Sequence, residues 1–155
     1  MHSKEDHHVV NEPMSTIDVV KLSPDAFVPV KASDGAAGFD LYACKSFVIA
    51  TKEWKEAKLG IAINIPSGYY GKISSRSGLA FNKKVLAFDG TIDSDYTGEL
   101  SALLYNAGEE KVEIRAGDRI GQLLILKLHE SNRMVEVSHL PATERGSKGF
   151  GSTGK

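Results

Sequence analysis

The sequence predicts an all-β domain, a sandwich or jelly roll, and two observations lead to this prediction. Short runs rich in β-branched and aromatic residues follow one another along most of the 155 residues, separated by turn signals. Residues 111–115 alternate cleanly between apolar and charged, which places Val112 and Ile114 on one buried face of a strand. With no internal repeat and no long linker, a chain of this length is expected to form one domain.

The leader, the domain and the tail differ in composition. Residues 1–16 are polar and lack apolar periodicity, so we expect a disordered leader there. The folded domain is expected over residues 17–144, and a flexible Gly-rich segment over residues 145–155. Within the domain, apolar runs predict strands at residues 17–20, 39–43, 47–50, 61–65, 69–73, 85–88, 100–105, 111–115, 120–128 and 134–137.

Two segments of the domain leave alternatives open. Residues 51–59 favour a helix by propensity, but between two strand-like runs we prefer a charged hairpin connection. Residues 120–128 are apolar on both faces, which indicates a strand that is buried on both sides or lies at a subunit contact.

Composition and charge exclude several classes of protein. The chain is 41% hydrophobic and 25% charged, as in ordinary globular proteins, and its net charge of −1 gives no general reason to expect nucleic acid or membrane binding. Cys44 is the only cysteine, so an intracellular, reducing location, cytoplasmic or nuclear, is expected. No apolar run is long enough to span a membrane, and the N-terminus lacks the apolar core of a signal peptide.

The stretch GTIDSDYTG at residues 90–98 is the first candidate site. Strand-like runs enter and leave it and glycines bound it, so the simplest geometry is a β-hairpin with Asp93, Asp95 and Tyr96 near its tip. If this tip is extended, Asp93 and Asp95 point the same way. Such a pair can act as a base or bind a cation through water, and an acidic solvated turn is the alternative.

Three further positions need a partner. Asp40 lies inside an otherwise apolar strand, where a carboxylate either forms a salt bridge or faces a site. Residues 74–80 place three hydroxyls and Arg76 in one turn, which suits an anion but also occurs in ordinary loops. Gln122 shares a face with Ile120, so it should be hydrogen-bonded either to the fold or to a ligand.

The last stretch, RGSKGFGSTGK at residues 145–155, combines glycines with phosphate-binding groups. It matches G-x-G-x-x-G by letter and nearly spells a P-loop, but without the flanking strand and helix neither motif has its structural context. A flexible tail is one interpretation. The other is a lid in which backbone N–H groups converge on phosphates while Phe150 covers a planar base.

Taken together, these stretches resemble the five motifs of the trimeric dUTPase family, in order and over essentially all of the chain after the leader. The resemblance implies an all-β jelly-roll (β-clip) homotrimer, with three active sites at subunit contacts and a flexible C-terminal lid. It implies hydrolysis of dUTP to dUMP and pyrophosphate, which limits uracil incorporation into DNA and supplies dUMP. The motifs are AGFDLY at 37–42, RSGLA at 76–80, GTIDSDYTG at 90–98, GDRIGQL at 117–123 and RGSKGFGSTG at 145–154.

The resemblance also implies roles for residues of the hairpin. Asp93 is the base that activates a water for attack on the α-phosphorus. Tyr96 packs against the deoxyribose and leaves no room for a 2′-hydroxyl. Backbone groups read uracil in a hairpin that is too narrow for the methyl group of thymine; they belong to Gly90, Thr91, Ile92 and the returning strand near Ser101.

The phosphates are implied to contact other subunits. Mg²⁺ lies on the triphosphate together with waters, and Asp40 contacts it only through water. A neighbouring subunit contributes Arg76, Ser77, Gly78 and Gln122, and the third subunit contributes Arg145, Phe150 and Gly151.

Ser75, Asp89, Thr91 and Gly121 depart from the common family pattern, and none of them removes a named catalytic group. Two alternatives remain on the same scaffold. The related dCTP deaminases lack the Asp93 arrangement and release ammonia. A catalytically silent nucleotide-binding module would not need Asp93, Arg76 and the complete tail.

Overall fold

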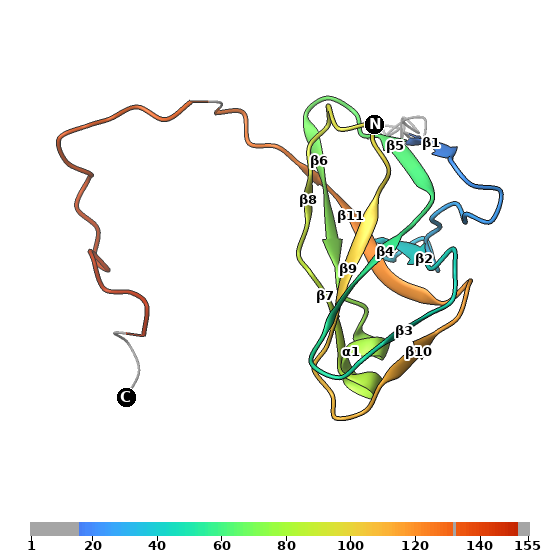
Figure 1. The fold of residues 1–155 in the computed structure, drawn as a ribbon. Helices are drawn as coiled ribbons and strands as arrows, with labels where there is room; N and C mark the ends of the chain where they lie inside the picture. Colours follow the sequence, from blue (N-terminus) through green and yellow to red (C-terminus); the bar gives the residue numbers. More distant parts are fainter. Residues whose placement is uncertain (1–15, 132, 152–155) are drawn as a thin grey trace, which may run out of the picture.

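The computed structural model describes residues 16–131 and 133–151, so the expected leader lies almost wholly outside the described residues. It confirms the all-β fold: a strand-rich body precedes an extended C-terminal segment that runs away from it (Figure 1). The strands are β1 (Asp18–Lys21), β2 (Phe39–Tyr42), β3 (Phe47–Ile49), β4 (Trp54–Lys58), β5 (Ile61–Asn64), β6 (Tyr69–Ser74), β7 (Val85–Ala87), β8 (Thr91–Ile92), β9 (Ser101–Asn106), β10 (Val112–Ile114) and β11 (Arg119–Lys127), and the helix is α1 (Ser77–Lys83).

The strands pair in four small antiparallel sheets. The largest has the order β2-β11-β6-β8, and the next has the order β4-β9-β7. The pairs β1-β5 and β10-β3 complete the set. Strands that are neighbours in sequence, such as β3 and β4 or β7 and β8, belong to different sheets. The sheets therefore wrap around one core, as in a jelly roll.

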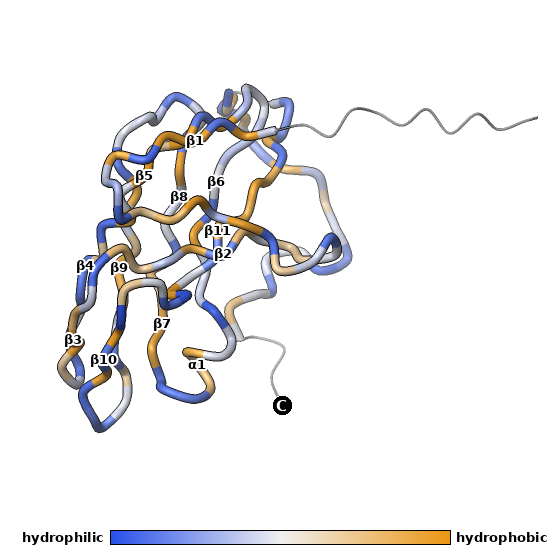
Figure 2. The backbone as a smooth tube through the Cα atoms, turned by 90° about the vertical axis from the view of Figure 1, so that its right-hand side faces the viewer, coloured by the Kyte–Doolittle hydropathy of each residue, from blue (hydrophilic) through white to orange (hydrophobic). Residues whose placement is uncertain are grey.

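Alternation along each strand fills this core. In β9, Ala102 and Leu104 are fully buried while Leu103 between them is exposed. Val112 and Ile114 are both buried, which confirms the prediction from residues 111–115. β11 lies between β2 and β6, so both of its edges are paired. Figure 2 shows hydrophobic colour along β7, whereas β4 is largely hydrophilic.

Residues 51–59 form neither a helix nor a charged connection inside a hairpin. A turn at Thr51 and Lys52 leads into β4, which pairs with β9 along its whole length. Ala57 is buried in the core. Helix propensity is a weak preference, and the pairing of β4 together with this burial outweighs it.

Two further differences concern residues outside the main sheets. The strand expected at residues 134–137 is wrong, because this segment has no regular structure and Met134, Val135 and Val137 are exposed. Apolar alternation stabilises a strand only where a neighbouring strand pairs with it. Helix α1 was not expected, since Ser77 and Gly78 are poor helix formers. No helix in the described part of the chain is long and apolar enough to cross a membrane.

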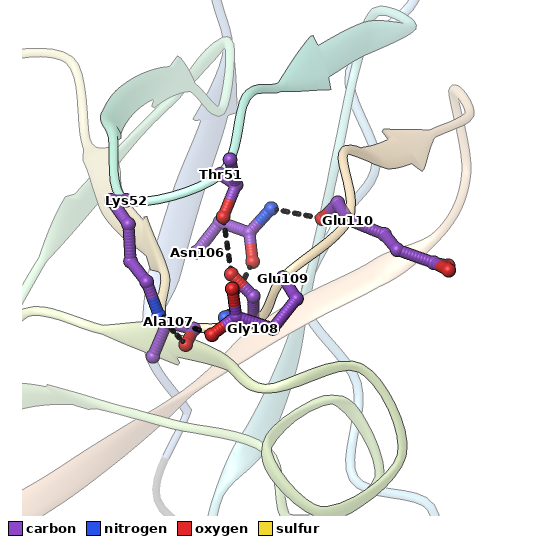
Figure 3. Close-up of polar contacts among 7 residues, drawn as sticks. All are labelled: Thr51, Lys52, Asn106, Ala107, Gly108, Glu109 and Glu110. Carbon is purple, nitrogen blue, oxygen red and sulfur yellow. Dashed lines mark hydrogen bonds and ion pairs between the residues drawn. The ribbon is translucent and has the colours of Figure 1, made fainter.

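A buried asparagine joins several loops at one corner of the body, which we call the Asn106 corner (Figure 3). Asn106 Nδ2 donates to the carbonyl oxygens of Ile49 (3.1 Å) and Glu110 (2.8 Å), and its Oδ1 accepts from Gly108 N–H (2.9 Å). Lys52 Nζ also donates to the carbonyl oxygen of Ala107 (2.7 Å). All the side-chain hydrogen-bonding groups of Asn106 are thus satisfied, which is the condition for burying an amide.

Candidate active site

The segment between β7 and β9 builds the first candidate pocket. β7 pairs with β9, which confirms the expected hairpin, but the intervening β8 leaves this sheet and pairs with β6. The Ile73 N–H donates to the carbonyl oxygen of Gly90 (2.9 Å), which holds the segment before β8 against β6. We call the result the hairpin pocket; it is lined by Glu56, Ile73, Gly90, Thr91, Ile92, Asp93, Tyr96, Glu99, Leu100 and Ser101.

Asp93 lines this pocket at the first position of a turn. The Tyr96 N–H donates to the carbonyl oxygen of Asp93 (3.1 Å), so residues 93–96 turn back instead of running extended. The expectation that Asp93 and Asp95 share a face is therefore wrong, because that rule applies to extended backbone. Asp93 lines the pocket and Asp95 does not.

Tyr96 lies folded over the returning backbone. A Cβ atom placed on Gly98 would be 2.7 Å from Tyr96 Oη and 2.8 Å from its Cζ, so the ring occupies the space that a side chain at position 98 would need. The Tyr96 hydroxyl donates to the carbonyl oxygen of Glu99 (2.8 Å). With 47% of the residue exposed, the ring remains available to a ligand.

The hairpin pocket is acidic. Three of its lining residues are carboxylates, Glu56, Asp93 and Glu99, and no Lys or Arg among the described residues lines it. Glu56 Oε1 accepts from the Ser101 hydroxyl (2.9 Å), and Glu99 Oε2 accepts from the Gly60 N–H (3.1 Å). Such a pocket suits a neutral hydrogen-bonding group and repels an anion.

A second pocket contains the candidate phosphate groups. We call it the arginine pocket; it shares no lining residue with the hairpin pocket. Arg76 precedes α1, and both Arg76 and Arg119 lie beside Asp40: Arg76 Nε is 3.4 Å from Asp40 Oδ1, and Arg119 Nη1 is 3.8 Å from Oδ2. The lining residues are Arg76, Gly78, Leu79, Asn82, Lys83, Glu113, Ile114, Gly117, Asp118 and Arg119.

Gln122 has its partner within the fold. Its Nε2 donates to the carbonyl oxygen of Ser75 (3.0 Å), and it lies opposite Asp40 and Ser74 in the sheet. A Cβ atom on Gly38 would be 2.9 Å from Gln122 Oε1, so glycine at position 38 leaves room for this side chain. Ser77 is exposed at the start of α1 and lines neither pocket.

The candidate residues of the tail contact neither pocket. The segment that contains Arg145, Phe150 and Gly151 runs outside the body (Figure 1). Arg145 Nε donates to the carbonyl oxygen of Lys148 (2.7 Å), and Phe150 is fully exposed. The structure thus brings the Asp93 group and the Arg76 group into two separate pockets, with the tail apart from both.

Sequence reasoning missed several polar residues of these pockets, among them Arg119, Glu56 and Glu99. Arg119 could have been identified, since it lies in the same turn motif as Gln122. Glu56 and Glu99 gave no signal, because only the pairing of β4 with β9 and the turn before β5 bring them to the hairpin pocket.

The described residues contain no cluster of three or more His, Cys, Asp or Glu side chains that could hold a metal ion by themselves. Mg²⁺ is commonly bound by one or two carboxylates together with substrate phosphates and waters. Asp40 fits that kind of site, since its carboxylate is 14% exposed and is already paired with two guanidinium groups. Contact through a water would leave both ion pairs in place.

Comparison with known proteins gives a consistent result. A family model described as dUTPase matches residues 25–154. The deoxyuridine 5′-triphosphate nucleotidohydrolase of Kluyveromyces lactis is 42% identical over 141 residues, covering 91% of this chain and 95% of that protein. The protein of the same name from Paramecium bursaria Chlorella virus 1 is 43% identical over 141 residues, covering 91% of this chain and 99% of that protein. Among solved structures, a Staphylococcus bacteriophage 80alpha dUTPase with dUPNHPP superposes with a TM-score of 0.85 at 28% identity, covering 92% of this chain and all of that one.

Proposed function

The chain belongs to the dUTPase family and is a dUTP diphosphatase, and we propose that its hairpin pocket receives the uracil and the deoxyribose of dUTP while Asp93 activates the attacking water. The observation that supports this assignment most directly is the hairpin pocket itself. It combines an exposed carboxylate with a tyrosine fixed beside it and contains no cationic residue among its described lining.

Uracil is neutral and presents alternating hydrogen-bond donors and acceptors, which suits a pocket walled by backbone and carboxylate groups. Gly90, Thr91 and Ile92 offer backbone groups on one wall, and Ser101 at the start of β9 offers them on the other. We assign Tyr96 to the sugar, because its ring is held over Gly98 at a fixed place. A fixed ring discriminates by excluding the 2′-hydroxyl of a ribonucleotide.

Asp93 acts as the general base in this proposal. Its carboxylate accepts a proton from a water as the water oxygen attacks the α-phosphorus, and the bond between that phosphorus and the pyrophosphate oxygen breaks. No hydrogen bond or ion pair of the Asp93 side chain occurs within the described residues, so its lone pairs remain available to a water. A general base must reach the proton that it removes, and an exposed pocket carboxylate meets that condition.

The triphosphate needs cations that the hairpin pocket does not offer. Arg76 and Arg119 supply them in the arginine pocket, where guanidinium groups can bind phosphate oxygens with two parallel hydrogen bonds. Because the two pockets share no residue, we propose that a neighbouring copy presents Arg76, Ser77, Gly78 and Gln122 to the hairpin pocket. The assembly is then a homotrimer with its sites at subunit contacts.

An apolar sheet face beside the hairpin pocket supports this association. Trp54, Leu86 and Leu103 are 54%, 43% and 37% exposed on the outer face of the β4-β9-β7 sheet, where Trp54 also packs on Tyr105 with ring centroids 4.8 Å apart. The cross-strand pairing of Trp54 and Leu86 with Tyr105 puts these side chains on one face. Exposed apolar clusters of this kind are typical of protein contacts. We propose that a second copy covers this one.

The tail and the metal complete the proposal. Arg145, Phe150 and Gly151 belong to a lid that closes over the site of other subunits, which is consistent with a tail that contacts no pocket of its own chain. Mg²⁺ would neutralise charge on the triphosphate when bound, and Asp40 would contact it through a water. We also propose an intracellular location, cytoplasmic or nuclear, which rests on the single cysteine.

A nucleotide panel tests the proposal. Pyrophosphate release should be Mg²⁺-dependent and much faster from dUTP than from dTTP, dCTP or UTP. Equal turnover of UTP and dUTP would remove the sugar role of Tyr96. Ammonia release from dCTP would indicate deaminase chemistry, which the comparisons do not favour, and binding of dUTP without turnover would indicate a silent module.

A further inference from the structure

The position of Tyr96 depends on the backbone of the two residues that follow Thr97. The ring lies against Gly98, and its hydroxyl donates to the carbonyl oxygen of Glu99 at 2.8 Å. Residues 97–99 belong to no strand. Because Tyr96 rests on irregular backbone, its position is well defined only if that backbone is itself held in place.

The side chain of Glu99 connects this backbone to the turn between β4 and β5. Its Oε2 accepts the N–H of Gly60 at 3.1 Å, in a half-buried position between the hairpin pocket and the turn that joins β4 to β5. This is the hydrogen bond of a carboxylate with a backbone N–H, a charge-assisted type that is stronger than a neutral one.

Gly60 lies in the turn between β4 and β5, where glycine is required. Its carbonyl oxygen accepts from the Leu22 N–H at 2.7 Å, and its φ of +67° is one that residues with side chains rarely adopt. A Cβ atom there would be 3.0 Å from Cβ of Ala26. The backbone also links this turn to the hairpin segment: the Leu59 N–H donates to the carbonyl oxygen of Leu100 (2.9 Å), and the Leu100 N–H donates to that of Ile61 (2.9 Å). The Glu99 side chain thus adds a second connection, one residue before Leu100.

We propose that Glu99 is a positioning residue that holds Tyr96 over the sugar subsite by tying residues 97–99 to Gly60, and that it thereby sets the discrimination between deoxyribose and ribose. The inference rests on the proposed sugar role of Tyr96. A structural role alone would lower stability without changing which sugar is accepted, so sugar discrimination is the informative measurement.

The test compares Glu99→Ala with Glu99→Gln. Alanine removes the acceptor for Gly60, whereas glutamine keeps an amide oxygen in its place. We expect Glu99→Ala to lower the ratio of kcat/KM for dUTP to that for UTP by about tenfold, the effect of losing one hydrogen bond to a charged group, and Glu99→Gln to retain most of it. The relative affinities for dUMP and UMP should change in the same direction, which gives a readout that does not depend on turnover.

A matched control is Glu109→Ala, which removes an exposed carboxylate paired with Lys52 at the Asn106 corner and should leave sugar discrimination unchanged.

Amide hydrogen exchange at Gly60 reports directly on its hydrogen bond to Glu99. Exchange should be slow in the wild type and faster in Glu99→Ala. Exchange as fast as that of a solvent-exposed amide in the wild type would overturn the proposal, even if Glu99→Ala does not fold.

The remaining outcomes are also decisive. Unchanged discrimination in Glu99→Ala overturns the proposal, and an equal loss in Ala and Gln variants assigns the effect to charge and overturns the tie to Gly60. Tyr96→Ala separates this inference from its premise. If that variant keeps the wild-type discrimination, the proposed sugar role itself fails; if it loses the discrimination while Glu99→Ala does not, only the positioning role fails.

Discussion

The hairpin pocket and the arginine pocket differ in charge and in how each is held together. The hairpin pocket contains three carboxylates, and among the described residues two of them are already bonded inside the chain, Glu56 to Ser101 and Glu99 to Gly60. The arginine pocket brings together three cationic side chains, Arg76, Lys83 and Arg119, and two carboxylates, Glu113 and Asp118. A neutral base suits the first and a triphosphate the second. This difference, in two pockets that share no lining residue, is the basis of our proposal that neighbouring copies complete each nucleotide site.

The largest expected effect removes the one hairpin-pocket carboxylate that we assign to the reaction. Asp93→Asn should lose turnover by about a hundred- to ten-thousand-fold, because an amide cannot accept the proton of the water. Binding of dUMP and the oligomer mass should be unchanged. The measurement is steady-state pyrophosphate release, with Asp95→Asn as the control. If Asp93→Asn stays active and Asp95→Asn does not, the two carboxylates have been assigned the wrong way round.

The next effect concerns the other pocket. Arg76→Ala should raise KM and lower kcat/KM for dUTP by about tenfold to a hundredfold through the loss of charge-assisted bonds to phosphate. Arg115→Ala, an exposed arginine outside both pockets, is the control. Asp40 is expected to position Arg76, so Asp40→Asn should produce a smaller loss of the same kind.

Mixing experiments test whether the halves come from different chains. Asp93→Asn, with its tail intact, is unfolded and refolded together with a truncated chain that ends at Glu144 and retains Asp93. If base and tail belong to different subunits, about a quarter of the sites receive both intact parts after random mixing. If both belong to one chain, activity stays at the sum of the two variants. Native mass spectrometry verifies that mixed trimers have formed, and mixed trimers without recovered activity would show that the lid closes over its own chain.

The smallest effect tests a wall of the hairpin pocket. Glu56→Gln keeps an acceptor for the Ser101 hydroxyl and should change KM for dUTP less than about twofold, while Glu56→Ala frees that hydroxyl and should change it several-fold. Melting temperature and KM are measured together. A melting temperature that falls with no change in KM would limit Glu56 to a structural role.

Much of the fold could be predicted from the sequence because burial has a regular period in strands. Val112, Ile114 and the hairpin of β7 and β9 followed from alternation and glycines. Residues 51–59 were misjudged because propensity is weak against pairing with β9. Residues 134–137 alternate in the same way but have no strand to pair with, and a single sequence cannot reveal that absence.

The candidate site residues also fall into two groups, those that local sequence predicts and those that only the fold brings together. Asp93, Tyr96, Arg76 and Gln122 belong to local stretches whose composition is informative by itself. The roles of Glu56 and Glu99 depend on contacts between residues 45 and 39 positions apart in the chain. Such contacts exist only once the sheets have formed, so no local sequence pattern predicts them.

The Asn106 corner bears on the order of events during folding. The bonds of Asn106 to Gly108 and Glu110 are local and can form within one turn, whereas its bond to Ile49 joins residues 57 positions apart. Closing so long a loop has an entropic cost that must be met before the contact stabilises anything, which makes such contacts slow to form. Until β3 arrives, water can accept this amide hydrogen; a misfolded chain that buries Asn106 without the Ile49 carbonyl oxygen would leave it unpaired, at a cost in stability. The hydrogen bonds of one buried side chain therefore favour the native arrangement of β3 over compact states in which β3 is misplaced.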